Sequence, residues 1–74
     1  MASIAVTQKI PFNEPEAVVV PAQLAVFLHT TEQVLAQDRY RGRGIPYVRY
    51  GRRILYRVKD IQSYLDANTH EMGA

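Results

Sequence analysis

Residues 35–65 of the chain read LAQDRYRGRGIPYVRYGRRILYRVKDIQSYL, and the spacing of the apolar side chains changes twice within them. Helical spacing stops at residues 42–46, where two glycines and a proline predict the end of a helix. Residues 47–58 then alternate as in a strand, with Gly51 interrupting the alternation. Helical spacing returns from Lys59. The segment therefore predicts a helix, a two-stranded hairpin that turns at Gly51, and a closing helix.

The alternation also predicts which side chains of the hairpin are buried. The buried face is expected to carry Val48, Tyr50, Ile54, Tyr56 and Val58. The opposite face is expected to carry Arg49, Arg53 and Arg57, with Arg52 exposed at the tip. The apolar stripe of the closing helix is expected to consist of Ile61, Tyr64 and Leu65.

Two short helices are expected before the hairpin. Pro21 suits the first position of a helix whose apolar residues recur at helical spacing, namely Leu24, Phe27 and Leu28. His29 and Thr30 interrupt this pattern, so His29 is interpreted as a turn or helix-end residue rather than a metal ligand. Thr30 is followed three residues later by Gln33, which is the capping-box signature of a second helix.

The second helix is expected to have one inward and one outward face. Val34 and Leu35 are expected to face inward. The outward face is expected to carry Gln33, Gln37 and Arg41, which follow one another at a spacing of four residues.

Three segments follow from these patterns. Residues 1–20 are interrupted by prolines and are expected to be an extended or disordered N-terminal arm, in which Ile4, Val6 and the run 17–20 can form short strands. Residues 21–68 are expected to be the folded domain, and residues 69–74 a flexible tail. The predicted fold class is mostly α with a small β-hairpin.

Length and composition exclude several classes of protein. A chain of 74 residues with 47% hydrophobic residues has room for one small core and none for a large catalytic cavity. It has no cysteine, which excludes disulfides and thiolate zinc sites and fits a reducing cytoplasm. Its longest apolar run, residues 17–20, is too short to cross a membrane. Metal-ligand spacing, nucleophile motifs and phosphate-loop motifs are lacking, so we expect no enzyme activity, cofactor or metal.

Positive charge is concentrated in residues 39–59, which hold eight of the nine Lys and Arg residues and no acid. By contrast, residues 1–38 contain one cation and four acids, and residues 60–74 contain three acids and no cation. Seven of the eight clustered cations are arginines, whose planar donor groups match phosphate and guanine. The basic block therefore predicts a polyanion-binding face rather than a merely solvated loop.

The order helix, tight turn, helix, basic hairpin and closing helix is typical of a small winged helix-turn-helix domain. In such a domain the second helix enters the major groove of DNA, and the hairpin, or wing, lies along the backbone or reaches the adjacent minor groove. The helix residues expected to face DNA are Thr31, Gln33, Gln37 and Arg41. Those of the turn and wing are Arg43, Arg49, Arg52 and Arg53. Glutamine pairs with adenine, and arginine with guanine or phosphate.

The same region resembles a known family. A glycine-rich turn ending in Pro46, the hairpin PYVRYGRR at residues 46–53 and the step YRVKD at residues 56–60 occur in this order. Over about residues 21–68 the chain is similar to the excisionase and AlpA-like branch of the MerR-type winged helix-turn-helix superfamily. Where many members have a large aromatic residue in the second helix, this chain has Asp38, which is expected to pair with Arg41 or Arg39.

The resemblance implies a sequence-specific DNA-binding protein of a phage, prophage or integrative element, located in the cytoplasm at the bacterial nucleoid. The leading hypothesis is an excisionase, a recombination directionality factor that binds and bends attachment-site DNA so that an integrase favours excision. Bending requires many phosphate contacts, so we expect several copies to assemble on the DNA, with the arm as a contact between neighbours. The expected partners are duplex DNA, other copies of the chain and an integrase.

Three alternatives remain open at this stage. One is a transcriptional regulator of the same family. Another is an interaction module whose arginines bind an acidic partner protein. In the third, the exposed Tyr40 and Tyr47 stack on the bases of single-stranded RNA.

Overall fold

Three strands and three helices follow one another in residues 10–70, the part of the chain that the computed structural model describes. In chain order they are β1 (Val18–Val19), α2 (Pro21–Phe27), α3 (Glu32–Tyr40), β2 (Val48–Tyr50), β3 (Arg53–Arg57) and α4 (Val58–Ala67). The predicted order of two helices, a hairpin and a closing helix is confirmed, and a short strand precedes it.

The strands form one antiparallel sheet in the order β1-β3-β2, with β3 in the centre. Val18 of β1 pairs with Arg57, and Val19 pairs with Tyr56. The prediction of a mostly helical fold with a two-stranded wing is therefore corrected to a mixed α/β fold with a three-stranded sheet. The third strand forms because pairing with β3 satisfies the backbone groups of both strands while Val19 becomes buried at 3% exposure.

The turn between β2 and β3 consists of Gly51 and Arg52, and it corrects the predicted faces of the hairpin. Gly51 has a φ of 60°, as the first position of a type II′ turn requires. The residues that face one another across the hairpin are Val48 and Leu55, Arg49 and Ile54, and Tyr50 and Arg53. Facing residues lie on the same side of a sheet, so Val48 and Tyr50 lie on the face opposite Tyr56, and Tyr50 is 73% exposed. The prediction that Tyr50 is buried beside Tyr56 is wrong, because it continued the alternation of side chains unchanged through the turn. With a two-residue turn, the even-numbered residues of β2 and those of β3 lie on opposite faces of the sheet.

Helices α2 and α3 are joined by a tight turn at residues 28–31. The N–H of Thr30 donates to the carbonyl of Ala25 at 2.9 Å, and the N–H of His29 donates to that of Val26 at 3.2 Å. These two hydrogen bonds form a Schellman motif, with His29 as the residue in the left-handed region at a φ of 58°. The interpretation of His29 as a turn residue is confirmed.

Helix α3 begins one residue later than the sequence pattern indicates. Its N-cap is Thr31, whose Oγ1 accepts a hydrogen bond from the Val34 N–H at 3.1 Å. Thr30 does not cap α3, because it belongs to the end of α2. Leu35 is buried as predicted, but Val34 is 43% exposed. Consecutive helical residues point about 100° apart, so Val34 and Leu35 do not both face inward.

The core shows that the described part of the expected arm belongs to the domain. The largest fully buried side chains are Tyr56, Leu24, Ile61 and Val58. Ile10 and Val19 are buried with them at 7% and 3% exposure, so the boundary expected at residue 21 does not hold for residues 10–20. Phe12 also packs against this core, its ring centroid 5.2 Å from that of Phe27. Ile4, Val6 and residues 71–74 lie outside the described residues.

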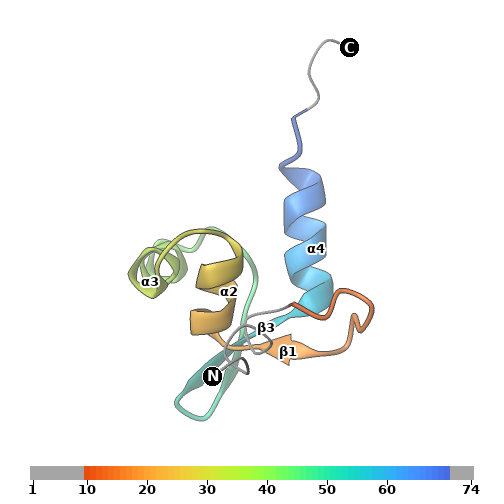
Figure 1. Ribbon diagram of the computed structural model, residues 1–74. Helices are drawn as coiled ribbons and strands as arrows, with labels where there is room; N and C mark the ends of the chain where they lie inside the picture. Colours follow the sequence, from red (N-terminus) through yellow and green to blue (C-terminus); the bar gives the residue numbers. More distant parts are fainter. Residues whose placement is uncertain (1–9, 71–74) are drawn as a thin grey trace, which may run out of the picture.

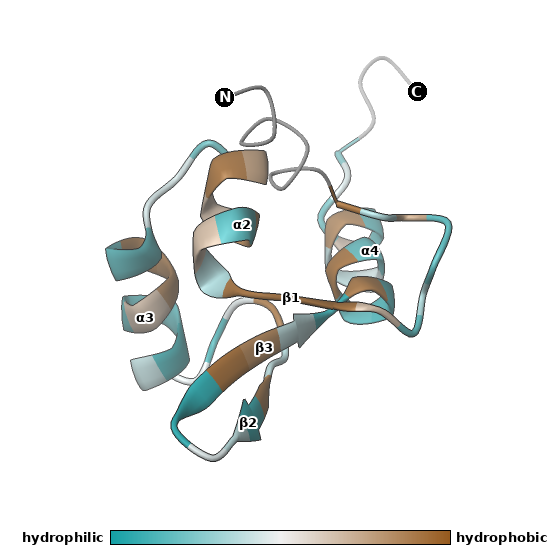
Figure 2. Cartoon of the chain, turned by 60° about the horizontal axis from the view of Figure 1, so that its bottom comes forward, coloured by the Kyte–Doolittle hydropathy of each residue, from teal (hydrophilic) through white to brown (hydrophobic). Residues whose placement is uncertain are grey.

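All three helices lie on one side of the sheet (Figure 1). Ile61, Tyr64 and Leu65 of α4 pack against the core, as the apolar stripe predicted. In Figure 2, α3 and the tip of the β2–β3 hairpin lie on the side of the molecule away from α4, and both are mainly hydrophilic. Within residues 10–70, no helix has the length and apolar character that crossing a membrane requires.

Candidate nucleic-acid interface

The outward face of α3 carries the polar residues that the sequence predicts there. Gln33, Gln37 and Arg41 are all exposed, and Arg41 is the C-cap of the helix. Tyr40 projects from the same helix with 93% exposure, the largest value among the exposed apolar and aromatic side chains of the described residues. Thr31 lies at the N-terminal end, where its hydroxyl caps the helix. Its side chain therefore has a structural role whether or not it also contacts a ligand.

Half of the basic block is occupied by contacts within the protein. Arg57 Nε lies 2.8 Å from Asp60 Oδ2, and Lys59 Nζ lies 4.0 Å from Glu16 Oε2. Arg43 and Arg39 are also engaged, as described below. The remaining four cations are Arg41, Arg49, Arg52 and Arg53. All four are exposed, and none forms an ion pair or side-chain hydrogen bond within residues 10–70.

The arginines of the hairpin do not share one face. Arg49 faces Ile54 and so lies on the helix side of the sheet, whereas Arg53 faces Tyr50 on the open side. Arg52 is in the turn at the tip. Positive charge therefore surrounds the tip instead of covering one side of it, because the two-residue turn exchanges the faces. The predicted common face of Arg49 and Arg53 is wrong, while their exposure is confirmed.

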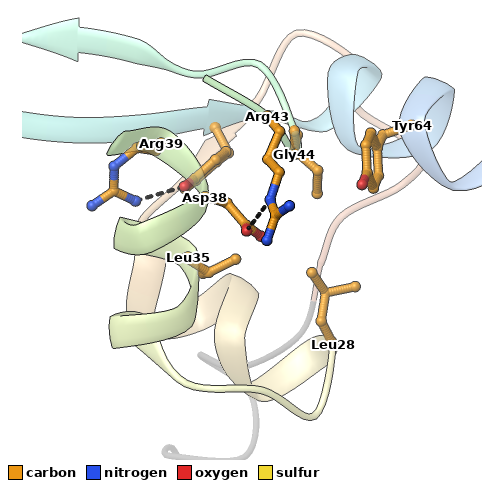
Figure 3. Close-up of a pocket in the computed structure, with 9 residues that line it drawn as sticks. Leu28, Leu35, Asp38, Arg39, Arg43, Gly44 and Tyr64 are labelled. Atoms are coloured by element: carbon orange, nitrogen blue, oxygen red, sulfur yellow. Dashed lines mark hydrogen bonds and ion pairs between the residues drawn. The ribbon is translucent and has the colours of Figure 1, made fainter. Parts of the chain in front are cut away.

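The loop after α3 turns Arg43 back onto its own helix. The N–H of Arg43 donates to the Asp38 carbonyl at 2.9 Å, and Gly42 has the left-handed φ of 71° that this helix end needs. The Arg43 side chain follows, with Nε 3.3 Å from Asp38 Oδ1 (Figure 3). Asp38 thus pairs with Arg43 and not with Arg41 or Arg39 as expected. Residue 43 is closer because the reversed chain brings it beside residue 38.

Arg39 is a residue of this region that the sequence reasoning did not assign to the site. Its Nη1 donates a hydrogen bond to the Tyr56 hydroxyl at 2.6 Å. The centre of its guanidinium lies 5.7 Å from the ring centroid of Tyr47 and 6.0 Å from that of Tyr56. Arg39 follows the buried Leu35 by four residues, and this spacing indicates the inward side of α3. The Arg39 side chain therefore connects α3 to Tyr47, just before β2, and to Tyr56 in β3.

Two hollows lie around these contacts. A small cavity of about 60 Å³ lies between the C-cap of α2, helices α3 and α4 and the loop after α3, and its lining includes Leu28, Leu35, Tyr64, Asp38 and Arg43. A larger and more open hollow of about 350 Å³ is bounded by Arg39, Tyr47 and the loop 42–46. No cluster of residues suited to holding a metal ion occurs in the described part of the chain.

Comparison with known proteins identifies no relative. No family model, no curated protein and no solved structure matches the chain.

Proposed function

We propose that the protein is a winged helix-turn-helix that binds double-stranded DNA, with α3 as the recognition helix and the β2–β3 hairpin as the wing. The observation that carries this proposal is the distribution of unpaired charge. The four exposed arginines without an acidic partner in residues 10–70 are located at the end of α3 and around the hairpin tip. These two elements lie on the same side of the molecule (Figure 2).

The order of elements supports the winged helix-turn-helix. Two helices joined by a tight turn precede a hairpin, and β1 pairs with the strand β3 of that hairpin. This pairing ties the hairpin to the segment that leads into α2, so the wing has a defined position relative to α3.

The exposed side chains supply the chemistry that duplex recognition needs. Gln33 and Gln37 are amide side chains on the outward face of α3, and an amide can make two hydrogen bonds to adenine in the major groove. Arg41, Arg49 and Arg52 are free to contact phosphates or guanine. Arg41 flanks the base-reading positions, and the hairpin arginines follow the backbone.

The resemblance over about residues 21–68 favours a protein of a mobile element, with an excisionase as the leading candidate and a transcriptional regulator of the same family as the alternative. An excisionase has no reaction of its own, because it acts by bending attachment-site DNA for an integrase. Bending a site of 20 to 30 base pairs costs on the order of 1–6 kcal/mol, which must be offset by phosphate contacts. One chain has only four free arginines for such contacts, so we expect several copies to bind side by side on the DNA. A footprint longer than one subunit covers, on the attachment site of the element, is the expected result. Protection of a promoter alone would instead indicate the regulator of transcription.

Salt dependence tests the DNA-binding proposal directly. Each phosphate contact contributes a slope of about −0.9 to log affinity against log salt, so four arginines predict a slope of about −3.6 or steeper on any duplex. Fluorescence anisotropy with labelled duplex, single-stranded DNA and RNA measures it. Absence of duplex binding in dilute buffer would contradict the proposal and favour an adaptor for an acidic protein, and a preference for single-stranded RNA would favour stacking by Tyr40.

A further inference from the structure

The open hollow of about 350 Å³ lies between the C-terminal end of α3 and the start of β2. Arg39 bounds it from α3, Tyr47 from the residue before β2, and the loop 42–46 closes it. In the proposed complex α3 and the hairpin both contact the duplex, so this hollow lies between the two contacting elements. None of the base-reading or wing residues assigned above belongs to it except Arg43.

Arg39 is anchored at the wall of this hollow by contacts with two tyrosines. The Tyr56 hydroxyl accepts a hydrogen bond from Arg39 Nη1 at 2.6 Å, and Tyr56 itself is only 1% exposed. The rings of Tyr47 and Tyr56 lie 5.7 and 6.0 Å from the guanidinium centre. An arginine has five N–H donors, and this anchor uses one of them. The other donors form no hydrogen bond within residues 10–70, and the hydrogen bond and ring contacts restrict the rotation of the side chain.

Neither ring contact nor hydroxyl neutralises the charge of Arg39. Tyrosine is uncharged at neutral pH, and no acidic group forms an ion pair with Arg39 within residues 10–70. The nearby Asp38 carboxylate is engaged by Arg43 at 3.3 Å, and Figure 3 shows Arg43 turned toward Asp38 while Arg39 extends in the other direction. Positive charge therefore remains at the wall of the hollow.

The backbone of the loop adds donors. The N–H groups of Gly44 and Ile45 donate no hydrogen bond within the described residues. Gly44 has a φ of 90°, and it approaches α3 closely, since a Cβ at this position would lie 3.1 Å from Asp38 Cβ. Consecutive backbone N–H groups in a tight turn favour an anion.

We propose that this hollow binds one phosphate group of the DNA backbone and that Arg39 is its principal ligand. The proposal rests on the proposed function and adds a contact between the recognition helix and the wing. Tyr56 and Tyr47 act as positioning residues, since the Tyr56 hydroxyl and the two rings hold the guanidinium in place. The advantage is entropic, because an arginine that is already anchored loses less side-chain freedom on binding than a free one.

The first test compares Arg39→Met with Arg57→Met by fluorescence anisotropy. Methionine keeps much of the stem that packs against the rings and removes the charge. For Arg39→Met, we expect roughly tenfold weaker binding to every duplex and a salt slope shallower by about 0.9. Arg57→Met is the matched control, because Arg57 is already paired with Asp60 at 2.8 Å. A slope for Arg39→Met equal to that of the wild type would overturn the assignment.

The second test separates anchoring from charge. Tyr56→Phe removes the hydroxyl that accepts from Arg39 and leaves the ring, whereas Tyr64→Phe removes a hydroxyl that has no hydrogen-bond partner in the described residues. We expect Tyr56→Phe to weaken duplex binding about threefold with an unchanged salt slope, and Tyr64→Phe to leave it unaltered. In the Arg39→Met background, Tyr56→Phe should add nothing. Equal effects of the two tyrosine changes would contradict the role of the hydroxyl.

Outcomes for the site and for the proposed function are distinct. If the wild-type protein does not bind duplexes, the proposed function is contradicted. If it binds duplexes and Arg39→Met leaves the salt slope unaltered, only the phosphate site is contradicted. Amide chemical shifts of Gly44 and Ile45 give an independent measurement, and a duplex is expected to move them. If inorganic phosphate alone moved them equally, the hollow would be assigned to free phosphate and the DNA assignment would fall.

Discussion

At the scale of single residues, two arginines with equal formal charge have different roles here. Arg52 is exposed at the hairpin tip without an acidic partner in residues 10–70, and Arg57 in the same hairpin is paired with Asp60. An exposed ion pair contributes little to stability, but it lowers the charge that is available to a polyanion. Pairing, and not residue type, therefore decides which cations belong to the candidate interface.

Gln37→Ala and Arg52→Ala should have different signatures in DNA binding. Loss of a base contact is expected to cost roughly 1–3 kcal/mol on the specific site and little on random duplexes. Loss of a phosphate contact is expected to weaken all duplexes alike and to make the salt slope shallower by about 0.9. Anisotropy on specific and random duplexes at several salt concentrations measures both. If Gln37→Ala weakened both kinds of duplex equally, Gln37 would not be a base-reading residue.

At the scale of elements, both helices that form the candidate DNA-binding unit end in the same backbone motif with different residues. Helix α2 ends with His29 in the left-handed region, and α3 ends with Gly42 there. A residue with a Cβ is strained in this region by about 1–2 kcal/mol, whereas glycine is not. The turn between α2 and α3 therefore holds strain that the end of α3 avoids.

His29→Gly is expected to stabilise the protein by about 1 kcal/mol, since glycine relieves this strain at the cost of some backbone entropy in the unfolded chain. Gly42→Ala is the reciprocal control and should destabilise it by a similar amount, since a Cβ at Gly42 meets no atom within 4 Å and only the backbone conformation is affected. Urea denaturation followed by circular dichroism measures both. A loss of stability in His29→Gly would show that the imidazole makes a compensating contact.

At the scale of the whole molecule, the sheet joins segments that are far apart in the sequence. Tyr56 in the central strand pairs with Val19 of β1 and accepts the hydrogen bond from Arg39 of α3. The segment before α2, helix α3 and the β2–β3 hairpin therefore meet at one buried residue. Their relative positions depend on the same core.

A chain that starts at residue 21 is expected to lose cooperative folding. The truncation removes β1 and the buried side chains Ile10 and Val19, each worth about 1.5–3 kcal/mol of burial, from a domain whose total stability is about 5–15 kcal/mol. Thermal unfolding and amide spectra measure the loss. A chain that starts at residue 10 is the matched control, and it should remain folded. If the chain that starts at residue 21 were as stable as the full chain, the interpretation of residues 1–20 as an arm outside the domain would be correct after all.

The local sequence predicts the helices, the turn at Gly51 and the density of positive charge, because each depends on neighbours a few residues apart. The spacing of four residues predicts that Gln33 and Gln37 are exposed on the same face of the helix. Pro21 predicts the start of α2. A short strand in the run 17–20 was also expected from the sequence, but its pairing with β3, the exposed face of Tyr50 and the pairing of Arg43 with Asp38 were decided only by tertiary structure. The strand pairing and the ion pair depend on which segment the folded chain brings close. The exposure of Tyr50 depends on the register of the hairpin, which the two-residue turn sets. The division of the cations into paired and free ones follows from the same contacts, and so does the anchoring of Arg39.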